Sequence, residues 1–491
     1  MCLICILQYR KSFVKYKKVV YSKKARVALS DCYCELRKTL TNNERNEETM
    51  NTKTSMLKRL VSVLFVIIFL LSLCAGCQTS NDQIQTLEKK ENVQLDIWVF
   101  FDMNEPGNHY VDLWDELAEK YGYDVNVKFY STEQIKGKLR VALVCKEMPD
   151  IFLVWGGTYP DYLIDAGECI PVQEYLQASD IDYKESYVMP YKDGNNYIIP
   201  CLVEAYAVTY YNQELIDKME LTVPTTWDEL LQLVQDVNDY NISHATRYAA
   251  INLGEKDAWL GELLYCMIVN RMDPYAYDKL KSGEIAFSDP IFIEAANRVR
   301  QLVDSHAFPS GFMEIGEVEA VENFIDGEAV LFPHQSTIVY YLLENMSEGS
   351  FHTMQFPSCN DEYNDIYSTY MMDINHTLTP GLCVSSRSEY PEEAVKICLD
   401  FAKTVNEINV SEYGYLNITN DEIAVPEDLE EPIVEFRQMI EEAEKMTAYW
   451  YAELPQEAAN NWRNLTKKLY AGEVDVETFI QEGEQYLQFE K

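Results

Sequence analysis

From position 93 onward, segments whose apolar residues have the spacing of a strand alternate with segments whose apolar residues have the spacing of a helix. Three segments have the alternating or continuous apolar pattern of strands, and two segments between them have apolar residues at helical spacing. In chain order the five segments are 95–100, 111–121, 125–129, 135–143 and 151–155. The order strand, helix, strand, helix, strand predicts a parallel, doubly wound α/β sheet with helices on both faces.

Ligands of doubly wound sheets bind beyond the carboxyl ends of the strands, where the winding reverses. Asp102 follows the first predicted strand and Trp155 ends the third, so both are candidates for a ligand site. Neither a GxGxxG loop nor a GxxxxGK(S/T) loop follows any of these strands. We therefore expect no nucleotide and no other cofactor.

The later part of the chain predicts a second lobe, because 491 residues exceed what one hydrophobic core usually serves. Thr226 and Glu229 have the spacing of a capping box, which predicts a helix beginning after Thr226. Another helix is predicted after Pro391, since proline is favoured in a first helical turn and apolar residues follow at helical spacing.

The N-terminal region contains a targeting signal. An uncharged apolar run at 60–73 follows Lys58 and Arg59, and Cys74-Ala75-Gly76-Cys77 comes next. This order resembles a bacterial lipobox, which predicts a lipoprotein signal peptide over 56–76 with lipid on Cys77. An uncleaved signal anchor is the alternative.

Two further segments precede the predicted folded region. Residues 1–55 have no persistent period, and we expect them to be a non-structural extension before a start at Met56. Residues 77–92 are polar and are expected to be a tether between the lipid anchor and a domain that spans 93–491.

The charge and the cysteines exclude several classes of function. From Cys77 onward there are 27 basic and 75 acidic residues, so the chain would be repelled by nucleic acid phosphates and suits neutral or cationic partners. The seven later cysteines are odd in number and widely spaced, which favours buried free thiols over a disulfide framework. The six histidines are scattered and form no HExxH motif, so no metal site is expected.

Five blocks in order resemble the extracellular solute-binding proteins of ABC sugar importers, the family of maltose-binding protein. The blocks are 148–171, 199–212, 224–231, 324–330 and 381–401. Together with the lipobox they are similar to this family across nearly the whole of residues 93–490.

The resemblance implies two α/β lobes, each a doubly wound sheet flanked by helices, that are joined by hinge crossings and close on a ligand. One lobe would comprise about 93–200 and 357–403, and the other about 207–355 and 404–491. It also implies a monomer, lipid-anchored on the extracytoplasmic face of a Gram-positive-type cell membrane. This monomer would deliver a sugar or oligosaccharide to the transmembrane subunits of an ABC permease.

A sugar presents hydroxyl groups around its ring and C–H groups on its faces, so its site needs acids or amides and aromatic rings. The resemblance implies such roles for Asp102, Trp155, Glu204, Tyr206, Gln335, Trp450 and Tyr451. Trp259 and Asp273 are further candidates in the second lobe. Gln335 stands near the place where the family often has a stacking tryptophan, which departs from the maltodextrin pattern. Packing in the core is the alternative role for Trp155, and packing on a helix is the alternative for both Trp450 and Tyr451. Asp102 could instead be an exposed acid in a turn.

Three other functions stay open on the sequence alone. A non-sugar solute, such as a peptide or a cationic metabolite, would suit the acidic surface. A glycosidase could use Asp102 and Glu204 as its carboxylate pair, which requires a separation of about 5–9.5 Å. A surface adhesin would need no ligand site.

Overall fold

A computed structural model describes residues 93–100, 108–188, 190–202, 205–360, 368–371 and 380–488. The predicted extension 1–55, the signal peptide 56–76, the tether 77–92 and its lipidation site Cys77 lie outside the described residues. So do the site candidates Asp102 and Glu204.

The strand–helix alternation that begins at residue 93 forms the first sheet, in which the strand order is β2-β1-β3-β10-β4. Its strands are β1 (Gln94–Phe100), β2 (Asp124–Tyr130), β3 (Ile151–Val154), β4 (Ile199–Pro200) and β10 (Gly381–Val384). β1 is parallel to both β2 and β3, which confirms the predicted parallel arrangement. β10 is antiparallel and lies between β3 and β4.

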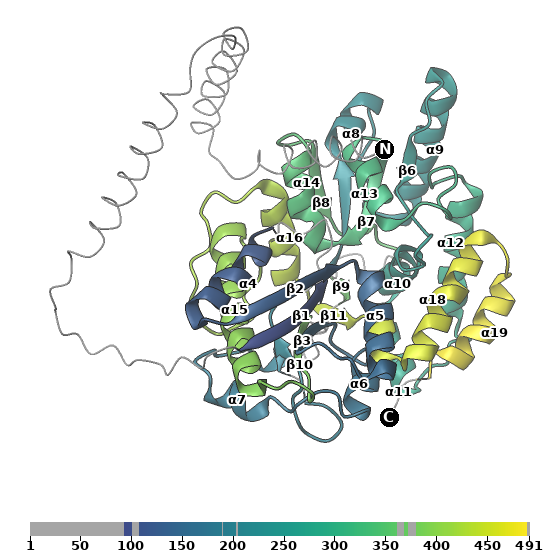
Figure 1. Ribbon diagram of the computed structural model, residues 1–491. Coiled ribbons are helices and arrows are strands. Elements are labelled where there is room, and N and C mark those ends of the chain that lie inside the picture. Colours follow the sequence, from purple (N-terminus) through teal and green to yellow (C-terminus); the bar gives the residue numbers. More distant parts are fainter. Residues whose placement is uncertain are drawn as a thin grey trace, which may run out of the picture. The chain divides into compact units, whose positions relative to one another are not determined.

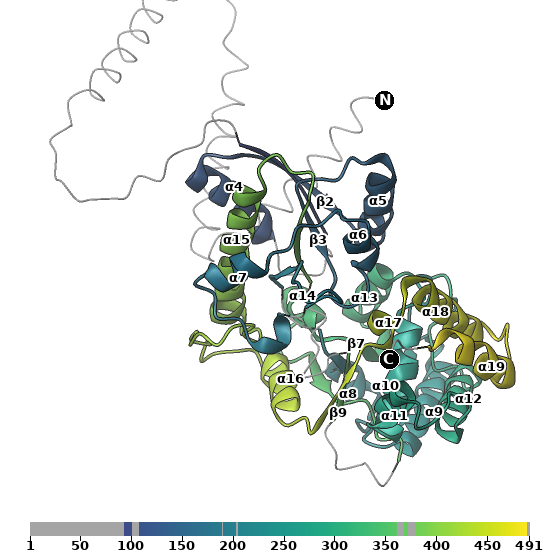
Figure 2. The same ribbon diagram turned by 90° about the horizontal axis from the view of Figure 1, so that it is seen from below.

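Helices cover both faces of the first sheet. α4 and α15 lie side by side on one face, and α5 lies on the other (Figures 1 and 2). The helices of this lobe are α4 (Asn108–Tyr121), α5 (Thr132–Cys145), α6 (Asp161–Asp165), α7 (Gln173–Ala178), the 3₁₀ turn η1 (Glu185–Tyr187) and α15 (Pro391–Tyr413). Proline stands at the start of α15, as the sequence predicts.

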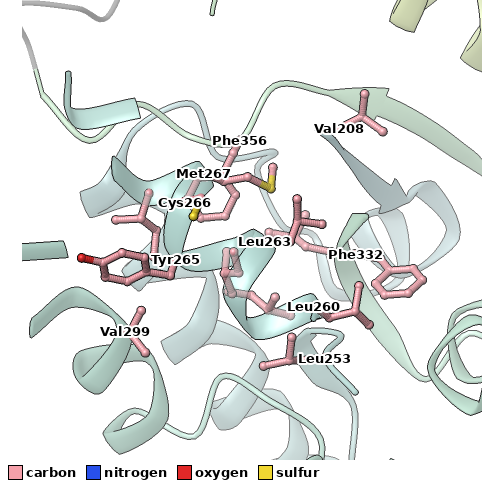
Figure 3. Close-up of a cluster of buried hydrophobic side chains, with 14 of the residues drawn as sticks. Val208, Leu253, Leu260, Leu263, Tyr265, Cys266, Met267, Val299, Phe332 and Phe356 are labelled. Atoms are coloured by element: carbon pink, nitrogen blue, oxygen red, sulfur yellow. The ribbon is translucent and has the colours of Figure 1, made fainter. Parts of the chain in front are cut away.

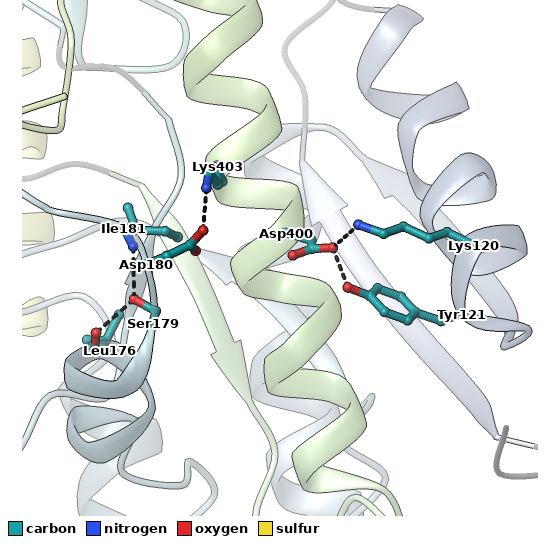
Figure 4. A network of polar contacts seen from close by, with 8 residues as sticks. All are labelled: Lys120, Tyr121, Leu176, Ser179, Asp180, Ile181, Asp400 and Lys403. Atoms are coloured by element: carbon teal, nitrogen blue, oxygen red, sulfur yellow. Dashed lines mark hydrogen bonds and ion pairs between the residues drawn. The ribbon is translucent and has the colours of Figure 1, made fainter. Parts of the chain in front are cut away.

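Polar contacts fasten α15 to its neighbours on the surface of the first lobe (Figure 4). Asp400 of α15 accepts from Lys120 at 2.6 Å and also from the hydroxyl of Tyr121, both at the end of α4. Lys403 donates to Asp180 at 2.6 Å in the segment after α7. These exposed pairs each contribute little energy, but they fix the side of α15 that faces away from the sheet.

The second sheet has the strand order β6-β7-β5-β8. Its strands are β5 (Ala207–Asn212), β6 (Ala249–Ile251), β7 (Ala329–Gln335) and β8 (Phe351–Met354). A separate parallel pair joins β9 (Ser368–Met371) to β11 (Lys445–Ala448).

Most of the described helices belong to the second lobe, some against this sheet and others packed on α10. They are α8 (Gln213–Met219), α9 (Trp227–His244), α10 (Leu260–Met272), α11 (Ala276–Ser282), α12 (Pro290–Asp304), α13 (Glu317–Ile325), η2 (Ser336–Ile338), α14 (Val339–Asn345), α16 (Glu431–Glu441), α17 (Trp450–Glu453), α18 (Gln456–Ala471) and α19 (Val476–Tyr486). The predicted capping box begins α9. The Thr226 side chain accepts from the Glu229 amide, and the Glu229 carboxylate accepts from the Thr226 amide.

Each sheet has its own hydrophobic core. The first core draws on residues between 93 and 202 and between 382 and 405, and the second on residues between 206 and 359 and between 415 and 487. The second core therefore extends to Cys359, slightly beyond the boundary expected from the sequence.

Helix α10 lies at the centre of the second core (Figure 3). All thirteen of its residues are buried, which is why its sequence is apolar on nearly every side. Leu263 has no exposed surface and packs in the same cluster as Val208 and Phe332.

The seven described cysteines are free thiols, six of them buried. The exception is Cys145, which is exposed at the end of α5. Among the described helices, none combines the length and the apolar character needed to cross a membrane.

We predict that Leu263→Ala lowers the free energy of unfolding by about 2–5 kcal/mol, because the deletion removes buried methyl groups and leaves a cavity. The matched control is Ile242→Ala on α9, where the side chain is 81% exposed, and it should change the stability by less than about 0.5 kcal/mol. Urea unfolding followed by circular dichroism measures both values. Equal effects in the two variants would contradict the placement of α10 in the core.

Candidate functional site

Two segments that connect the lobes, the outgoing one after β4 and the returning one before β10, meet the first sheet at the end formed by the carboxyl ends of β3 and β4. A further connection follows α15, since Val405 belongs to the first core and Tyr415 to the second. In the antiparallel ladder Gly381 pairs with Val154 on one side and with Pro200 on the other, so the start of β10 lies beside the carboxyl ends of β3 and β4. The amides of Cys201 and Leu202 both donate to the carbonyl of Pro380 at 3.3 Å. The outgoing and returning segments are therefore hydrogen-bonded neighbours at the edge where β1 and β3 also end.

The connecting segments meet the second sheet at the end where β5 begins and where β6, β7 and β8 end. Ala207 at the start of β5 pairs with Gln335 at the end of β7, and β8 ends at the same side of β5. β6 is parallel to β7, so the segment after Ile251 also emerges there. Ligands of α/β sheets bind beyond the carboxyl ends of the strands. The connecting segments join the two sheets at these same strand ends.

Trp155 forms an aromatic platform at the first edge. Its ring stacks on Phe100 at the end of β1, with ring centres 3.8 Å apart and planes 12° apart, and Tyr159 packs edge-on against it at 5.1 Å. Lys136 of α5 places its Nζ 5.1 Å from the centre of the Trp155 ring. Trp155 is only partly buried, so part of the indole stays accessible.

Tyr451 on α17 is held next to the segment that follows Trp155. Thr158 donates its amide to the carbonyl of Ala452 at 2.9 Å and its hydroxyl to the carbonyl of Leu454 at 2.6 Å. These bonds join a loop of the first lobe to the end of α17. They bring the chain segments that carry Trp155 and Tyr451 together.

Arg463 of α18 supports Tyr451 from one face. The guanidinium carbon lies 3.5 Å from the centre of the Tyr451 ring, and the Tyr449 hydroxyl accepts a hydrogen bond from the same arginine. The Tyr451 hydroxyl accepts from Gln456 at 2.8 Å and donates to Asn460 at 3.2 Å. The orientation of this ring is therefore fixed by α18.

Trp259 lies on the segment between β6 and α10, at the edge of the second sheet. Its indole N–H donates to Glu317 at 3.2 Å, and its ring meets His334 edge-on at 5.0 Å. Burial lowers the pKa of His334 to about 3, so the imidazole is neutral and its 3.5 Å approach to Glu317 is not an ion pair.

Gln335 and Tyr206 lie beside each other at this same edge. Gln335 is partly exposed at the end of β7, whereas Tyr206 is buried. The Tyr206 amide donates to the Ser336 hydroxyl at 3.1 Å, and the Ser336 amide donates to the Tyr206 carbonyl at 2.7 Å. These bonds anchor the first crossing where it enters the second lobe.

Two other candidates occupy different surroundings. Trp450 is 1% exposed and lies within the second core, stacked against Tyr277 at 5.1 Å and Trp462 at 5.8 Å. Asp273 follows the last residue of α10, about 20 Å along the helix axis from Trp259 at 1.5 Å per residue. Its carboxylate accepts from Lys279 at 2.7 Å and from the Tyr275 amide at 2.9 Å.

The structure adds residues that the sequence reasoning did not select. Phe100 and Tyr159 frame Trp155, and Arg463 fixes Tyr451. The spacing along α18 could have indicated Arg463, because it falls four residues after Ala459, which is buried, and so lies on the inward face of the helix. A charged residue on an inward helix face needs a partner, and the aromatic rings supply it.

Two buried carboxyl groups lie near the start of α10. Glu255 accepts from the Gly261 amide at 2.7 Å, and Glu262 accepts from the Trp462 indole at 3.2 Å. Burial raises the pKa of Glu255 to about 8 and also raises the pKa of Glu262. Glu255 is therefore largely protonated at neutral pH.

Residues 112–431 match the model of a family described as bacterial extracellular solute-binding proteins. The chain belongs to this family. This solute-binding protein has no match among curated proteins.

Solved structures with the same fold confirm the two-lobed architecture. A structure from a study of xylan utilization by Caldanaerobius polysaccharolyticus has a TM-score of 0.70 at 24% identity, and the match covers 80% of this chain and 99% of that one. A chitin oligosaccharide binding protein has a TM-score of 0.69 at 16% identity, with 81% and 98% covered. A sugar transporter protein from Bacillus licheniformis, in complex with stachyose, has a TM-score of 0.59 at 17% identity, with 80% and 98% covered.

We predict that Glu255→Gln flattens the pH dependence of stability in this solute-binding protein. The folded pKa of about 8 lies above the ordinary value of 4.5, so the contribution of Glu255 is full below pH 4.5 and is lost as the pH rises through about 8. Glutamine does not titrate and keeps an acceptor for the Gly261 amide. Urea midpoints measured from pH 4.5 to 9 should fall for the wild type relative to the variant.

Glu229, whose pKa is shifted in the opposite direction, provides a control for the protonation of Glu255. The pKa of Glu229 is lowered by hydrogen bonds from the Thr225 amide and hydroxyl, so its contribution is present above pH 4.5 and is lost at more acidic pH. Glu229→Gln should therefore differ from the wild type in a slope below pH 4.5. Parallel profiles for the wild type and Glu255→Gln between pH 4.5 and 9 would show that Glu255 is not protonated in the fold.

Proposed function

We propose that this protein binds a carbohydrate at the strand ends of its two sheets, beside the segments that connect the lobes, and delivers it to an ABC permease. The observation that carries the proposal is the platform at Trp155, which is stacked on Phe100 at the carboxyl edge of the first sheet. A flat, partly exposed indole offers a face to the C–H groups of a sugar ring, and neighbouring polar groups can bind its hydroxyls.

The second lobe supplies complementary groups. Tyr451 is held in place by Arg463, while Gln335 and Trp259 lie at the edge of the second sheet. Asp102 and Glu204, proposed as hydrogen-bonding acids, belong to the segments that follow β1 and β4. A ligand that contacts both lobes favours the closed arrangement by its difference in affinity for the closed and open states.

Relatives of the same fold support carbohydrate as the ligand class. Proteins that bind a chitin oligosaccharide or stachyose share this architecture. Trp450 and Asp273 contribute less to the proposal, because one is packed in the core and the other holds the turn after α10. The ligand is released unchanged, so the protein acts as a receptor and not as a glycosidase.

We predict that Trp155→Ala weakens carbohydrate binding at least tenfold, because it removes the exposed half of the stacked pair. A thermal-shift screen of oligosaccharides, peptides and polyamines first identifies a ligand, since binding to the folded state raises the unfolding midpoint. Isothermal titration calorimetry then compares the wild type with the variant.

The matched control is Trp98→Ala on the same sheet. Trp98 is also partly buried, but it packs against Tyr130 and donates to Asp96 within the strands, away from the edge. Its replacement should leave the affinity unchanged. Equal affinities for Trp155→Ala and the wild type would place the ligand elsewhere, and a response to peptides or polyamines alone would overturn the sugar assignment.

The proposal includes attachment of the protein to the outer face of the membrane through Cys77. We predict that intact-mass measurement of the membrane-extracted protein gives a chain that begins at a diacylated Cys77. Treatment that removes ester-linked acyl chains should lower this mass and provides the control. A mass that begins at Met1 or Met56 would contradict lipoprotein processing.

A further inference from the structure

A histidine and two glutamates meet where β8 packs against α16. His352 belongs to β8, and Glu431 and Glu435 lie one turn apart on α16. Residues four positions apart share one face of a helix, so both carboxylates point to the same side. One ligand atom from each of the three residues lies within 4.8 Å of the other two.

Neighbouring groups hold two members of this cluster in place. His352 Nδ1 lies 2.8 Å from Glu435 Oε1, and the Tyr211 ring stacks on the imidazole with centres 5.2 Å apart. Glu435 Oε2 accepts from the Thr353 amide at 2.8 Å. Such outer contacts are typical of metal ligands, whose orientation they fix.

The cluster has two carboxylates and little positive charge of its own. In the part of the chain that the structure describes, Glu435 contacts His352, and neither glutamate pairs with a lysine or arginine. A divalent cation among the three residues would neutralise both carboxylates at once.

We propose that His352, Glu431 and Glu435 form a binding site for a Zn²⁺ ion. An imidazole nitrogen with carboxylate oxygens is a donor set that suits zinc, whereas magnesium and calcium prefer oxygen ligands alone. Glu431 is exposed, so its side chain can move toward the ion. Three protein ligands leave a fourth position for water.

Bound zinc would link β8 to α16, and through α16 would steady the segment that leads to β11 and α17. This site could not be predicted from the sequence, because His352 and Glu435 are 83 residues apart and form no spaced motif. The inference stands independently of the proposed carbohydrate ligand.

The test titrates the full chain with Zn²⁺ by calorimetry after removal of metals with a chelator. The wild type should bind one zinc ion at this site, and zinc should raise its unfolding midpoint. His352→Ala and Glu431→Ala should each weaken zinc binding at least tenfold. Glu431→Ala is the safer variant for folding, because that side chain is exposed.

The matched control is Glu441→Ala, which removes an exposed carboxylate from the far end of the same helix and should keep the wild-type affinity. Circular dichroism without metal verifies that each variant is folded. The proposal is overturned if the folded wild type binds no zinc, if both site variants bind it as tightly as the wild type, or if Mg²⁺ and Ca²⁺ bind equally well.

Discussion

The pairing of β10 with both β3 and β4 is the constraint on which the candidate ligand site depends. β10 returns to the first sheet about 180 residues after β4 has left it, yet Gly381 pairs with both Val154 and Pro200. Because β10 runs antiparallel, the return occurs at the edge where β3 and β4 end. The outgoing and returning segments therefore both meet the first sheet beside Trp155. A rotation about the connecting segments would change the distance between the facing ends of the two sheets while each core stays intact.

The second lobe has the greater share of buried ionisable groups. Glu255 and Glu262 are fully buried and Arg463 is partly buried around α10 and α18, where an isolated charge would be costly. Protonation of Glu255 avoids that cost, and the stacking of Arg463 on Tyr451 reduces it. The same interactions hold the ring that faces the first lobe, so the polar network in this core contributes to the shape of the site.

The sequence was sufficient for the strands and helices from β1 to β3, because their apolar periods are long and bounded. It could not predict where β10 inserts, since that pairing depends on a contact between distant segments. Nor could it separate Trp450 from Tyr451. These neighbours lie on a four-residue helix, which is too short for a period to show that Trp450 enters the core while Tyr451 stays partly exposed. The family resemblance indicates both residues as ligand contacts, and only their packing in the structure shows that one is buried and the other partly exposed.

The two aromatic rings at the candidate site differ in how a ligand could approach them. One face of Trp155 is covered by Phe100, and Lys136 lies over the ring at 5.1 Å. A cation–π contact at a solvent-accessible site is worth about 0.5–1 kcal/mol, which is less than the 1.4 kcal/mol that a tenfold change in affinity represents. Loss of this contact to a sugar ring would therefore cost little affinity. Arg463, in contrast, is held by Tyr449 and covers one face of Tyr451, so a ligand would use the other face or the edge of that ring.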